Sequence, residues 1–220
     1  MNGTSTITLI GGGRGLHTVA TGFFKYHDLD LAAIVCNAQN KSVNPIGILP
    51  RLFDPVSSIR ETVQRIICSD LIVVCPGRLH SETIPLLASG EITKALKEDI
   101  RGNCVYLCML TTPYDPYIVS ANDVVREIER HTSPGIFNYV LYQNPKPYGE
   151  KFPEKRQTRP PTINNCGKTI YVGSDLLDCK KTSTHFGDTS ELLSHDPLKT
   201  ARALYQFIKS QQIYYYSSGR

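Results

Sequence analysis

A cluster of glycines near the start of the chain carries the clearest chemical signal in the sequence. The cluster follows an apolar run rich in β-branched residues and precedes residues with helical spacing. Glycine can adopt positive φ and lacks a Cβ atom, so its backbone can approach a ligand closely. A helix that begins here points its free N–H groups and the positive end of its dipole at the turn. This predicts a phosphate-binding turn, with a ligand-free tight turn as the alternative, at Gly11, Gly12, Gly13, Arg14 and Gly15.

This turn departs from two common nucleotide-binding fingerprints. The dinucleotide motif G-x-G-x-x-G requires glycine or alanine at the position of Leu16, and no Gly-Lys-Ser/Thr of a P-loop follows the glycines. The dinucleotide motif also places an acidic residue after the second strand, where this chain has Asn37. Asn37 can hydrogen-bond a ribose but carries no charge. A nicotinamide-dependent reductase is therefore disfavoured, and Asn37 stays a candidate nucleotide contact.

A second glycine turn, Pro76, Gly77 and Arg78, follows the apolar run Leu71–Cys75. Ligands of open parallel sheets bind outside the carboxyl ends of the strands, so this turn should face the same crevice as the first. Guanidinium groups suit phosphate oxygens, and Arg78 together with Arg14 would neutralise a diphosphate without a metal ion. An ordinary strand-to-helix turn and a solvent-facing Arg14 are the alternatives.

Buried strands alternate with helical segments along the chain, which predicts an α/β fold with parallel neighbours. We expect residues 1–220 to form a single three-layer, Rossmann-like nucleotide-binding domain with a mostly parallel, doubly wound sheet. The predicted strands are 7–10, 31–36, 71–75, 105–110 and 137–142, with a short last strand at 169–172. The predicted helices are 14–26, 58–67, 82–88, 120–131 and one that begins at Pro197.

Local patterns refine these elements. Ser120 and Asp123 fit a capping box in its acid-for-Glu form. The stretch 145–161 contains five prolines and five Lys or Arg residues, which is typical of a mobile loop that is either solvated or in contact with an acidic partner. In the last helix, the residues expected to point inward are Leu198, Ala201, Leu204, Phe207 and Ile208.

The composition describes a soluble globular protein. Of the 220 residues, 40% are hydrophobic and 20% are charged, and the net charge of +4 is too small to indicate nucleic-acid binding. No signal peptide is visible and no apolar stretch is long enough to cross a bilayer, so we expect a cytoplasmic protein without membrane contact. The seven cysteines include no C-x-x-C pair, which is typical of reduced thiols rather than of a metal site. Five of them lie in or beside apolar runs and are expected to behave as small hydrophobes: Cys36, Cys68, Cys75, Cys104 and Cys108.

Several motifs, in this order, resemble the family that unites the gluconeogenesis factor (YvcK-like) proteins and 2-phospho-L-lactate transferase (CofD-like). Residues 11–16 are similar to the family's GGGTGL, and residues 70–79 to its D-x-I-x-x-G-P-G-S-L-Y. Residues 84–92 and 105–124 resemble the segments I-x-P-N-L-L-x-x-G-I and V-Y-V-C-N…V-S-D-H-V. Near the end, Asp175-Leu176-Leu177 and His195-Asp196-Pro197 resemble D-L-L and R-H-D-P.

The resemblance implies a Rossmann-like domain that binds a nucleotide-sugar in the regulatory branch, whose roles include the regulation of cell shape. In the transferase branch, the implied ligand is a guanosine-diphosphate-activated phospholactate. Carried over by position, the four glycines of residues 11–15 form the phosphate site, and Pro76 and Gly77 form the second ligand loop. Thr111 and Thr112 stand where the family has a polar loop after its fourth strand.

The departures from the family pattern concern its catalytic acids. The family follows its second strand with Asp-Asp-Gly-Gly, but this chain has Cys36-Asn37-Ala38 there. Phosphoryl transfer depends on carboxylates that hold a divalent cation, and this pair is absent. We therefore expect a regulatory, non-enzymatic protein that binds a nucleotide or UDP-sugar and needs no cofactor. A phosphotransferase that uses Mg²⁺, with Asp115 and Asp123 as candidate ligands, is the alternative, and homo-oligomerisation stays open.

Overall fold

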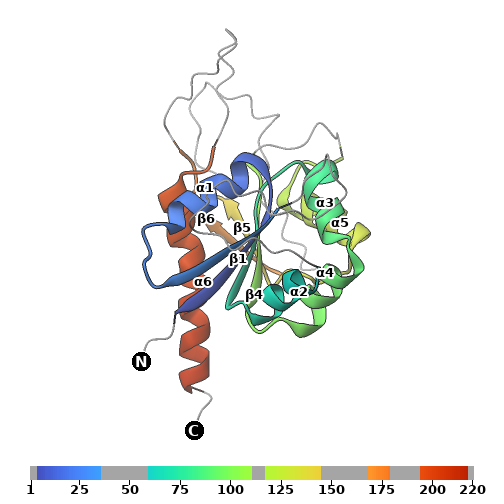
Figure 1. The fold of residues 1–220 in the computed structure, drawn as a ribbon. Helices are drawn as coiled ribbons and strands as arrows, with labels where there is room; N and C mark the ends of the chain where they lie inside the picture. Colours follow the sequence, from blue (N-terminus) through green and yellow to red (C-terminus); the bar gives the residue numbers. More distant parts are fainter. Residues whose placement is uncertain (1–3, 36–58, 111–116, 145–167, 179–193, 218–220) are drawn as a thin grey trace.

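The computed structural model describes residues 4–35, 59–110, 117–144, 168–178 and 194–217, and a six-stranded sheet forms the centre of the fold (Figure 1). The strand order is β2-β1-β3-β4-β5-β6, and every neighbouring pair is parallel. The strands are β1 (Ser5–Gly11), β2 (Leu29–Val35), β3 (Leu71–Val74), β4 (Asn103–Leu107), β5 (Tyr139–Gln143) and β6 (Ile170–Ser174). The predicted α/β, Rossmann-like architecture is confirmed.

Helices cover both faces of the sheet, which makes the fold three-layered (Figure 1). One face carries α1 (Gly13–Phe23) and α6 (Pro197–Ser217), which share one hydrophobic cluster with the sheet. The opposite face is covered by α2 (Ile59–Cys68), α3 (Ile84–Leu87), α4 (Gly90–Lys94) and α5 (Ala121–His131), with the π-helical turns η1 (Leu79–Thr83) and η2 (Ala95–Asp99).

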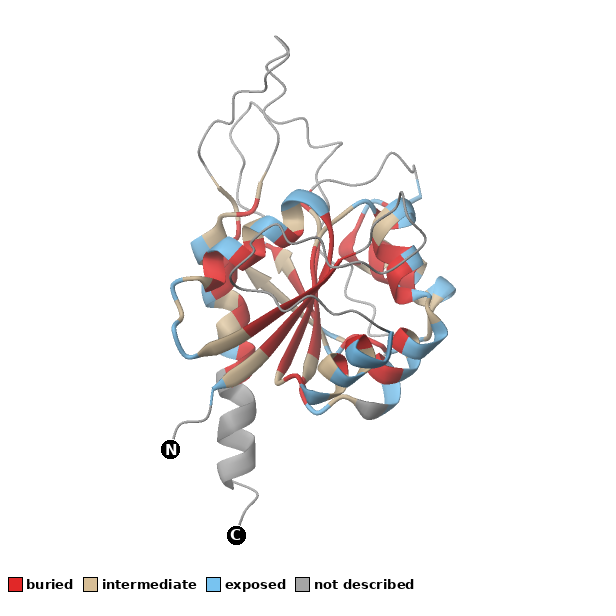
Figure 2. Cartoon of the chain, viewed as in Figure 1, coloured by how far each residue is buried: buried red, intermediate tan, exposed pale blue. Residues whose placement is uncertain are grey.

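Burial on both faces explains the continuous apolar runs of the central strands (Figure 2). All four residues of β3 are fully buried, because this strand lies between β1 and β4 with helices on either side. The β-branched residues that dominate β3 also suit the pleated, tightly packed surface of a central strand. The strands thus form the rigid layer from which the connecting loops project.

The strand order creates a switch point between β1 and β3. The chain leaves β1 through α1 to reach β2 on one side, and then returns through α2 to reach β3 on the other side of β1. The two connections cover opposite faces of the sheet, so the loops after β1 and β3 diverge from a common point. In open α/β sheets this is the place where ligands bind.

Helix α6 packs directly on α1. A Cβ atom at Gly22 would lie 2.0 Å from the Pro197 carbonyl oxygen, so only glycine permits the two helices to come this close. The rings of Tyr26 and Tyr205 stack at 4.5 Å, and the Tyr205 hydroxyl donates a hydrogen bond to Asp28 at 3.1 Å. These contacts fix the helix that starts in the first glycine turn.

Several local expectations are confirmed and several are wrong. The capping box of Ser120 and Asp123 is formed, and Cys75, Cys104 and Cys108 are buried. Cys68, by contrast, is exposed at the end of α2, and Leu198, expected to point inward, is 46% exposed. The Leu198 amide takes part in the Asp196 cap at the first turn of α6, and its side chain is not part of the hydrophobic cluster that the later residues of this helix join.

The helices near the second glycine turn also differ from the expectation. The predicted helix 82–88 begins earlier, with the π-helical turn η1, and only residues 84–87 are α-helical. The sequence did not predict α4 and η2, because Gly90 opens a short segment without strong helical periodicity. No helix in the described ranges is long and apolar enough to cross a membrane.

Candidate functional site

The first glycine turn has the backbone conformation that only glycine adopts readily. Gly11 has φ of +152° and Gly13 has φ of +57°, so both occupy a region that side chains with a Cβ atom disfavour. Gly12 lies between them in extended conformation and is the N-terminal cap residue of α1. Having no side chain, Gly12 cannot cap the helix, and the first turn of α1 contains no acidic residue.

The second glycine turn lies directly against the first. The Cys75 amide donates a hydrogen bond to the Ile10 carbonyl at 2.8 Å, which aligns the ends of β3 and β1. A Cβ atom at Gly15 would lie 1.8 Å from the Pro76 carbonyl oxygen. Gly15 is therefore required for the packing of α1 on the second turn, a role different from the ligand approach expected for all the glycines of residues 11–15.

The structure thus brings together both predicted loops, Gly11–Gly15 and Pro76–Arg78, at the switch point between β1 and β3. Arg14 is exposed, which agrees with the solvent-facing alternative, and the Arg78 side chain is 83% exposed. Both guanidinium groups are therefore accessible to an anion from solvent, and Arg78 Nε also lies close to a carboxylate of its own segment. Of the other polar groups near the second turn, His80 is exposed and Thr83 is buried.

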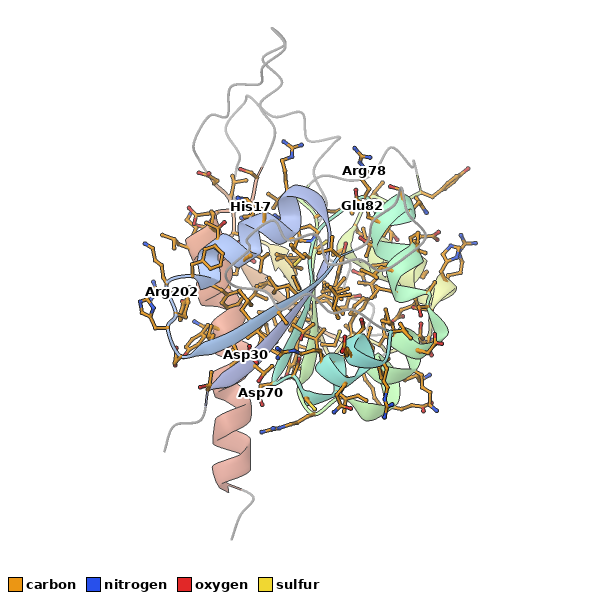
Figure 3. The ribbon with its side chains drawn as sticks, viewed as in Figure 1. His17, Asp30, Asp70, Arg78, Glu82 and Arg202 are labelled. Atoms are coloured by element: carbon orange, nitrogen blue, oxygen red, sulfur yellow. The ribbon has the colours of Figure 1, made fainter. Side chains whose placement is uncertain are left out.

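Glu82 is a carboxylate at this site that sequence reasoning missed (Figure 3). Its Oε2 atom accepts a hydrogen bond from the Arg78 amide at 3.3 Å, and its Oε1 atom lies 3.9 Å from Arg78 Nε. Oε2 would also lie 3.1 Å from a Cβ atom at Gly77 and 4.0 Å from one at Gly13. The carboxylate therefore lies between the two glycine turns, and only 20% of the side chain is exposed.

The thiol beside the glycine turns is not a nucleophile. Cys75 is fully buried, and its Cβ atom would lie 3.1 Å from a Cβ atom at Gly11. Burial raises the pKa of the Cys75 thiol far above its usual value, because the thiolate would lose its hydration. Since the thiolate is the reactive form, covalent chemistry at Cys75 is disfavoured.

On the other half of the same sheet edge, polar groups pair with one another. His195 is buried, and its Nε2 atom lies 3.2 Å from the Cys108 carbonyl, to which it donates as the neutral tautomer. Burial lowers the pKa of His195 to about 4, outweighing the opposite effect of this hydrogen bond. Gln143 accepts a hydrogen bond from the Leu176 amide at 2.7 Å. These contacts hold the ends of β4, β5 and β6 together.

The helices on that half are capped by their own side chains. Asp123 accepts hydrogen bonds from the Ser120 amide at 2.9 Å and the Ser120 hydroxyl at 2.7 Å, which completes the cap of α5. Burial acts to raise the pKa of Asp123, but the hydrogen bonds from Ser120 and Val119 outweigh it, so the pKa is lowered. At the start of α6, Asp196 accepts from the amides of Leu198 and Lys199 at 2.9 and 3.0 Å.

Asp123 is therefore engaged in helix capping and is a poor ligand for a metal ion. Asp115, the other acid proposed for magnesium, lies outside the described residues, as do Asn37, Thr111, Thr112 and the stretch 145–161. Within the described ranges, no group of three or more His, Cys, Asp or Glu side chains is arranged to hold a metal. The described residues thus offer the glycine turns one nearby carboxylate, Glu82, and do not fit a carboxylate-held Mg²⁺.

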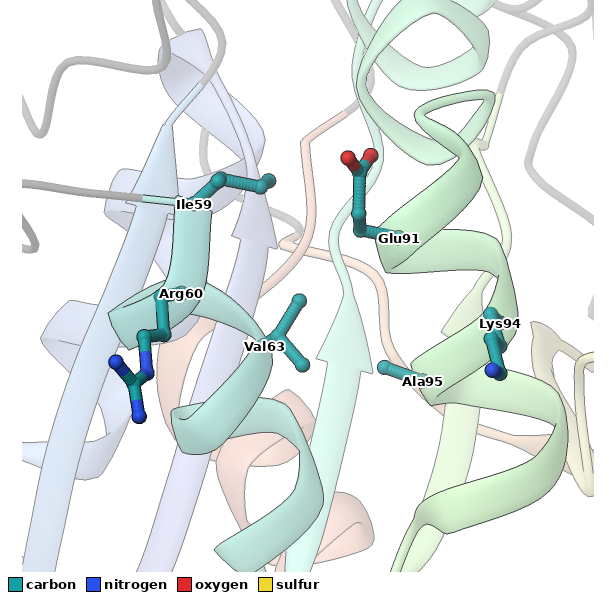
Figure 4. Close-up of a pocket in the computed structure, with 6 residues that line it drawn as sticks. All are labelled: Ile59, Arg60, Val63, Glu91, Lys94 and Ala95. Carbon is teal, nitrogen blue, oxygen red and sulfur yellow. The ribbon is translucent and has the colours of Figure 1, made fainter.

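A separate groove of about 370 Å³ lies between α2 and α4 (Figure 4). Apolar side chains alternate with charged ones around it, and none of its residues belongs to either glycine turn. It is lined by Ile59, Arg60, Val63, Glu91, Lys94 and Ala95. The groove offers no amide cluster and no charge of one sign, so it does not extend the candidate site.

Chemically, the switch-point site suits an anion that needs no covalent attachment. A helix N-terminus without a side-chain cap and exposed guanidinium groups are features that can bind phosphate oxygens through charge-assisted hydrogen bonds. The nearby thiol is buried, and the nearby carboxylate is already hydrogen-bonded. Among the described residues at the switch point, neither of these two groups is poised for nucleophilic or acid–base catalysis.

Comparison with known proteins gives the family context. The family model described as 2-phospho-L-lactate transferase CofD matches residues 51–166, more than half of the chain. A curated protein of Thermotoga maritima named "Putative gluconeogenesis factor" is 24% identical over 156 residues, which cover 69% of this chain and 48% of that protein. The chain thus spans about half the length of this curated relative.

Solved structures show the same fold. A crystal structure of BH3568 from Bacillus halodurans, described as a member of the UPF0052 family, matches with a TM-score of 0.67 at 15% identity. The match covers 92% of this chain and 99% of that one. A second BH3568 structure matches with a TM-score of 0.56 at 21% identity, over 71% of this chain and 49% of that one. At these identities the likeness supports the fold.

Proposed function

This chain belongs to the CofD family, and on that premise we propose that it is a non-catalytic, regulatory protein that binds a nucleotide or a nucleotide-sugar such as a UDP-sugar. The diphosphate binds at the switch point, between the glycine turns that follow β1 and β3. The resemblance to a gluconeogenesis factor supports the regulatory role.

One observation carries this proposal: the N-terminus of α1 lies at the switch point and has no side chain to cap it. The first four N–H groups of a helix need partners outside the helix. Helices α5 and α6 obtain such partners from Ser120 and Asp196. A phosphate group would supply them to α1, and the helix dipole would favour its negative charge.

Arg14 and Arg78 support the same proposal through their charge and position. Each follows or lies within a glycine turn, and each side chain is exposed and able to reach a ligand at the switch point. Their planar guanidinium groups bind phosphate oxygens in a bidentate manner. They compensate the negative charge that a divalent cation neutralises in phosphoryl-transfer enzymes.

Thermal unfolding with a panel of nucleotides tests the proposal. A ligand at 100 times its Kd adds about 2.7 kcal/mol to the free energy of unfolding, which raises the Tm of a protein of this size by roughly 5–10 °C. We expect UDP-sugars, UDP or GDP to produce such a shift, and uridine or guanosine, which lack phosphate, to produce none. An unchanged Tm with every nucleotide at millimolar concentration contradicts nucleotide binding.

The transferase activity named in the description of the matching family model is the second candidate. It requires a divalent cation held by acids, with Asp115 as the remaining acid from the sequence prediction. Magnesium-dependent turnover of a nucleoside-diphosphate-activated phospholactate, abolished in Asp115→Asn, would establish this activity. Nucleotide binding without magnesium-dependent turnover would leave the regulatory role.

A further inference from the structure

Glu82 places a negative charge where the proposed ligand would place its own. Its carboxylate lies between the two glycine turns, next to both Gly13 and Gly77. It is held there by the Arg78 amide, whose hydrogen bond to Oε2 measures 3.3 Å. Because the side chain is only 20% exposed, bulk water screens this charge less than it would screen a fully exposed one.

The position of Glu82 is set by its own segment. The Glu82 amide donates to the Arg78 carbonyl at 2.9 Å while the Glu82 carboxylate accepts from the Arg78 amide, so the first helical turn closes on itself. The reciprocal bonds hold the side chain toward the turn and away from solvent. A phosphate that binds between the turns must therefore lie beside this carboxylate.

A carboxylate interacts differently with a free terminal phosphate and with one that is esterified to a sugar. A free terminal phosphate carries about −1.5 to −2 charges at pH 7 and is repelled strongly. A terminal phosphate that is esterified to a sugar carries a single negative charge, and sugar hydroxyls can donate hydrogen bonds to a carboxylate, which only accepts them. Like charges at close range are a common means of excluding a competing ligand.

We propose that Glu82 is a specificity-determining residue that selects nucleotides whose terminal phosphate is esterified, such as nucleotide-sugars, over free nucleoside diphosphates. The proposal rests on the proposed function, since it names the ligand class of the same site. Glu82 acts by repelling the second negative charge of a free terminal phosphate and by accepting a hydrogen bond from the sugar. Arg14 and Arg78 supply the attraction that both ligand classes share.

Isothermal titration of wild type and Glu82→Gln with UDP, UDP-glucose, GDP and GDP-mannose tests this selection. The buffer is at pH 8, where the terminal phosphate is fully ionised, and contains EDTA so that no divalent cation neutralises the phosphates. We expect wild type to bind the sugar-linked nucleotide about tenfold more tightly than the free diphosphate. In Glu82→Gln this ratio falls toward one, mainly because the free diphosphate binds more tightly.

Glu91→Gln is the matched control, because it removes the same charge from an exposed position on α4 outside the glycine turns. Glutamine at position 82 retains a side-chain oxygen for the Arg78 amide, so the turn should remain folded, which circular dichroism and the Tm verify. If wild type binds sugar-linked nucleotides and free diphosphates equally, or if Glu82→Gln changes both affinities by the same factor, the selection is overturned but the binding function stands. Absence of nucleotide binding by either form overturns both.

Discussion

The carboxyl edge of the sheet has two halves that differ in how their polar groups are paired: a paired half at β4, β5 and β6, and an open half at β1 and β3. At the ends of β4, β5 and β6, His195 pairs with a carbonyl, Gln143 with an amide, and Asp196 caps a helix. At the ends of β1 and β3, glycines replace the side chains that could make such pairs, and the nearby arginines are exposed. The described polar groups of the first half pair within the chain, whereas the second half has a helix N-terminus without a side-chain cap and exposed cations.

This difference between the two halves distinguishes polar groups that stabilise the fold from polar groups that remain accessible to a ligand. Buried donors and acceptors without partners are expensive, so a fold satisfies them wherever it can. The capping box of α5 shows that this chain uses standard caps where a helix needs only stability. Glycine at the start of α1 gives this helix no side-chain cap and therefore less stability. Such a glycine is expected where a ligand or close packing requires the absence of a side chain.

The largest effect is expected from a side chain that obstructs the close contact between the two glycine turns. In Gly15→Ala, the new methyl group would meet the Pro76 carbonyl oxygen, which lies 1.8 Å from its ideal position. Backbone must move, and we expect the free energy of unfolding to fall by about 3 kcal/mol and nucleotide binding to be lost. Urea denaturation and titration measure the two effects.

Gly90→Ala is the control for that substitution. No atom lies within 4 Å of a Cβ atom at Gly90, and the residue starts α4, so alanine should stabilise the protein by up to about 1 kcal/mol. Equal stability of Gly15→Ala and wild type would mean that the two turns do not pack against each other in solution.

Acid should lower the free energy of unfolding through a histidine on the paired half of the edge. The pKa of His195 is about 4 in the folded state against 6.5 for the ordinary side chain, so the fold favours the neutral form. This stabilisation is complete above pH 6.5 and is lost as the pH falls toward 4, amounting to about 2 kcal/mol at pH 5. Urea denaturation at pH 7.5 and pH 5 measures the loss.

Other groups also titrate in acid, so the comparison needs a variant. His195→Gln keeps an N–H donor for the Cys108 carbonyl but cannot be protonated, and its stability should change less between the two pH values. An identical pH dependence of variant and wild type would show that His195 is not buried in its neutral form.

Replacing the two arginines near the glycine turns should weaken nucleotide binding without changing the free energy of unfolding. Arg14→Gln and Arg78→Gln should each weaken nucleotide binding about tenfold, because each removes a charge-assisted contact with phosphate. Arg202→Gln, an exposed arginine on α6 away from both turns, is the control and should leave the affinity unchanged (Figure 3). If all three variants bind alike, the two arginines do not contact the ligand.

The smallest effect is expected from the capped helix. Ser120→Ala removes the hydroxyl of the capping box and should lower the free energy of unfolding by about 1 kcal/mol, as measured by urea denaturation. Nucleotide affinity should be unchanged, because α5 starts on the paired half of the edge. A large loss of affinity in this variant would mean that both halves contact the ligand.

Much of the fold was predictable because it depends on local patterns. Strand β3 is a continuous apolar run, and such runs are typical of central parallel strands, so its place was predicted within one residue. The cap of α5 was predictable from Ser120 and Asp123 alone, since a capping box spans four consecutive residues. Both glycine turns were found because glycine clusters after a strand are themselves a local signal.

The features that were missed depend on contacts between distant residues. The packing role of Gly15 was not predicted, because it depends on Pro76, which the fold brings close across 61 positions of sequence. Glu82 appeared to be an ordinary residue of a surface helix, and only the packing of the two turns places its carboxylate near Gly13. A sequence-level signal for Glu82 was available in its spacing of four residues from Arg78, which permits the bond back to the start of the segment.

The packing of α6 on α1 has a consequence for synthesis of the protein. Residues near Phe23 emerge from the ribosome long before Ala201, Leu204 and Ile208, which cover the same hydrophobic cluster. At 5–20 residues per second, the apolar face of α1 waits on the order of ten seconds or more for its cover. During that interval the nascent chain exposes an apolar surface of the kind that chaperones recognise, and the helix that starts in the first glycine turn is fixed only when the last helix docks.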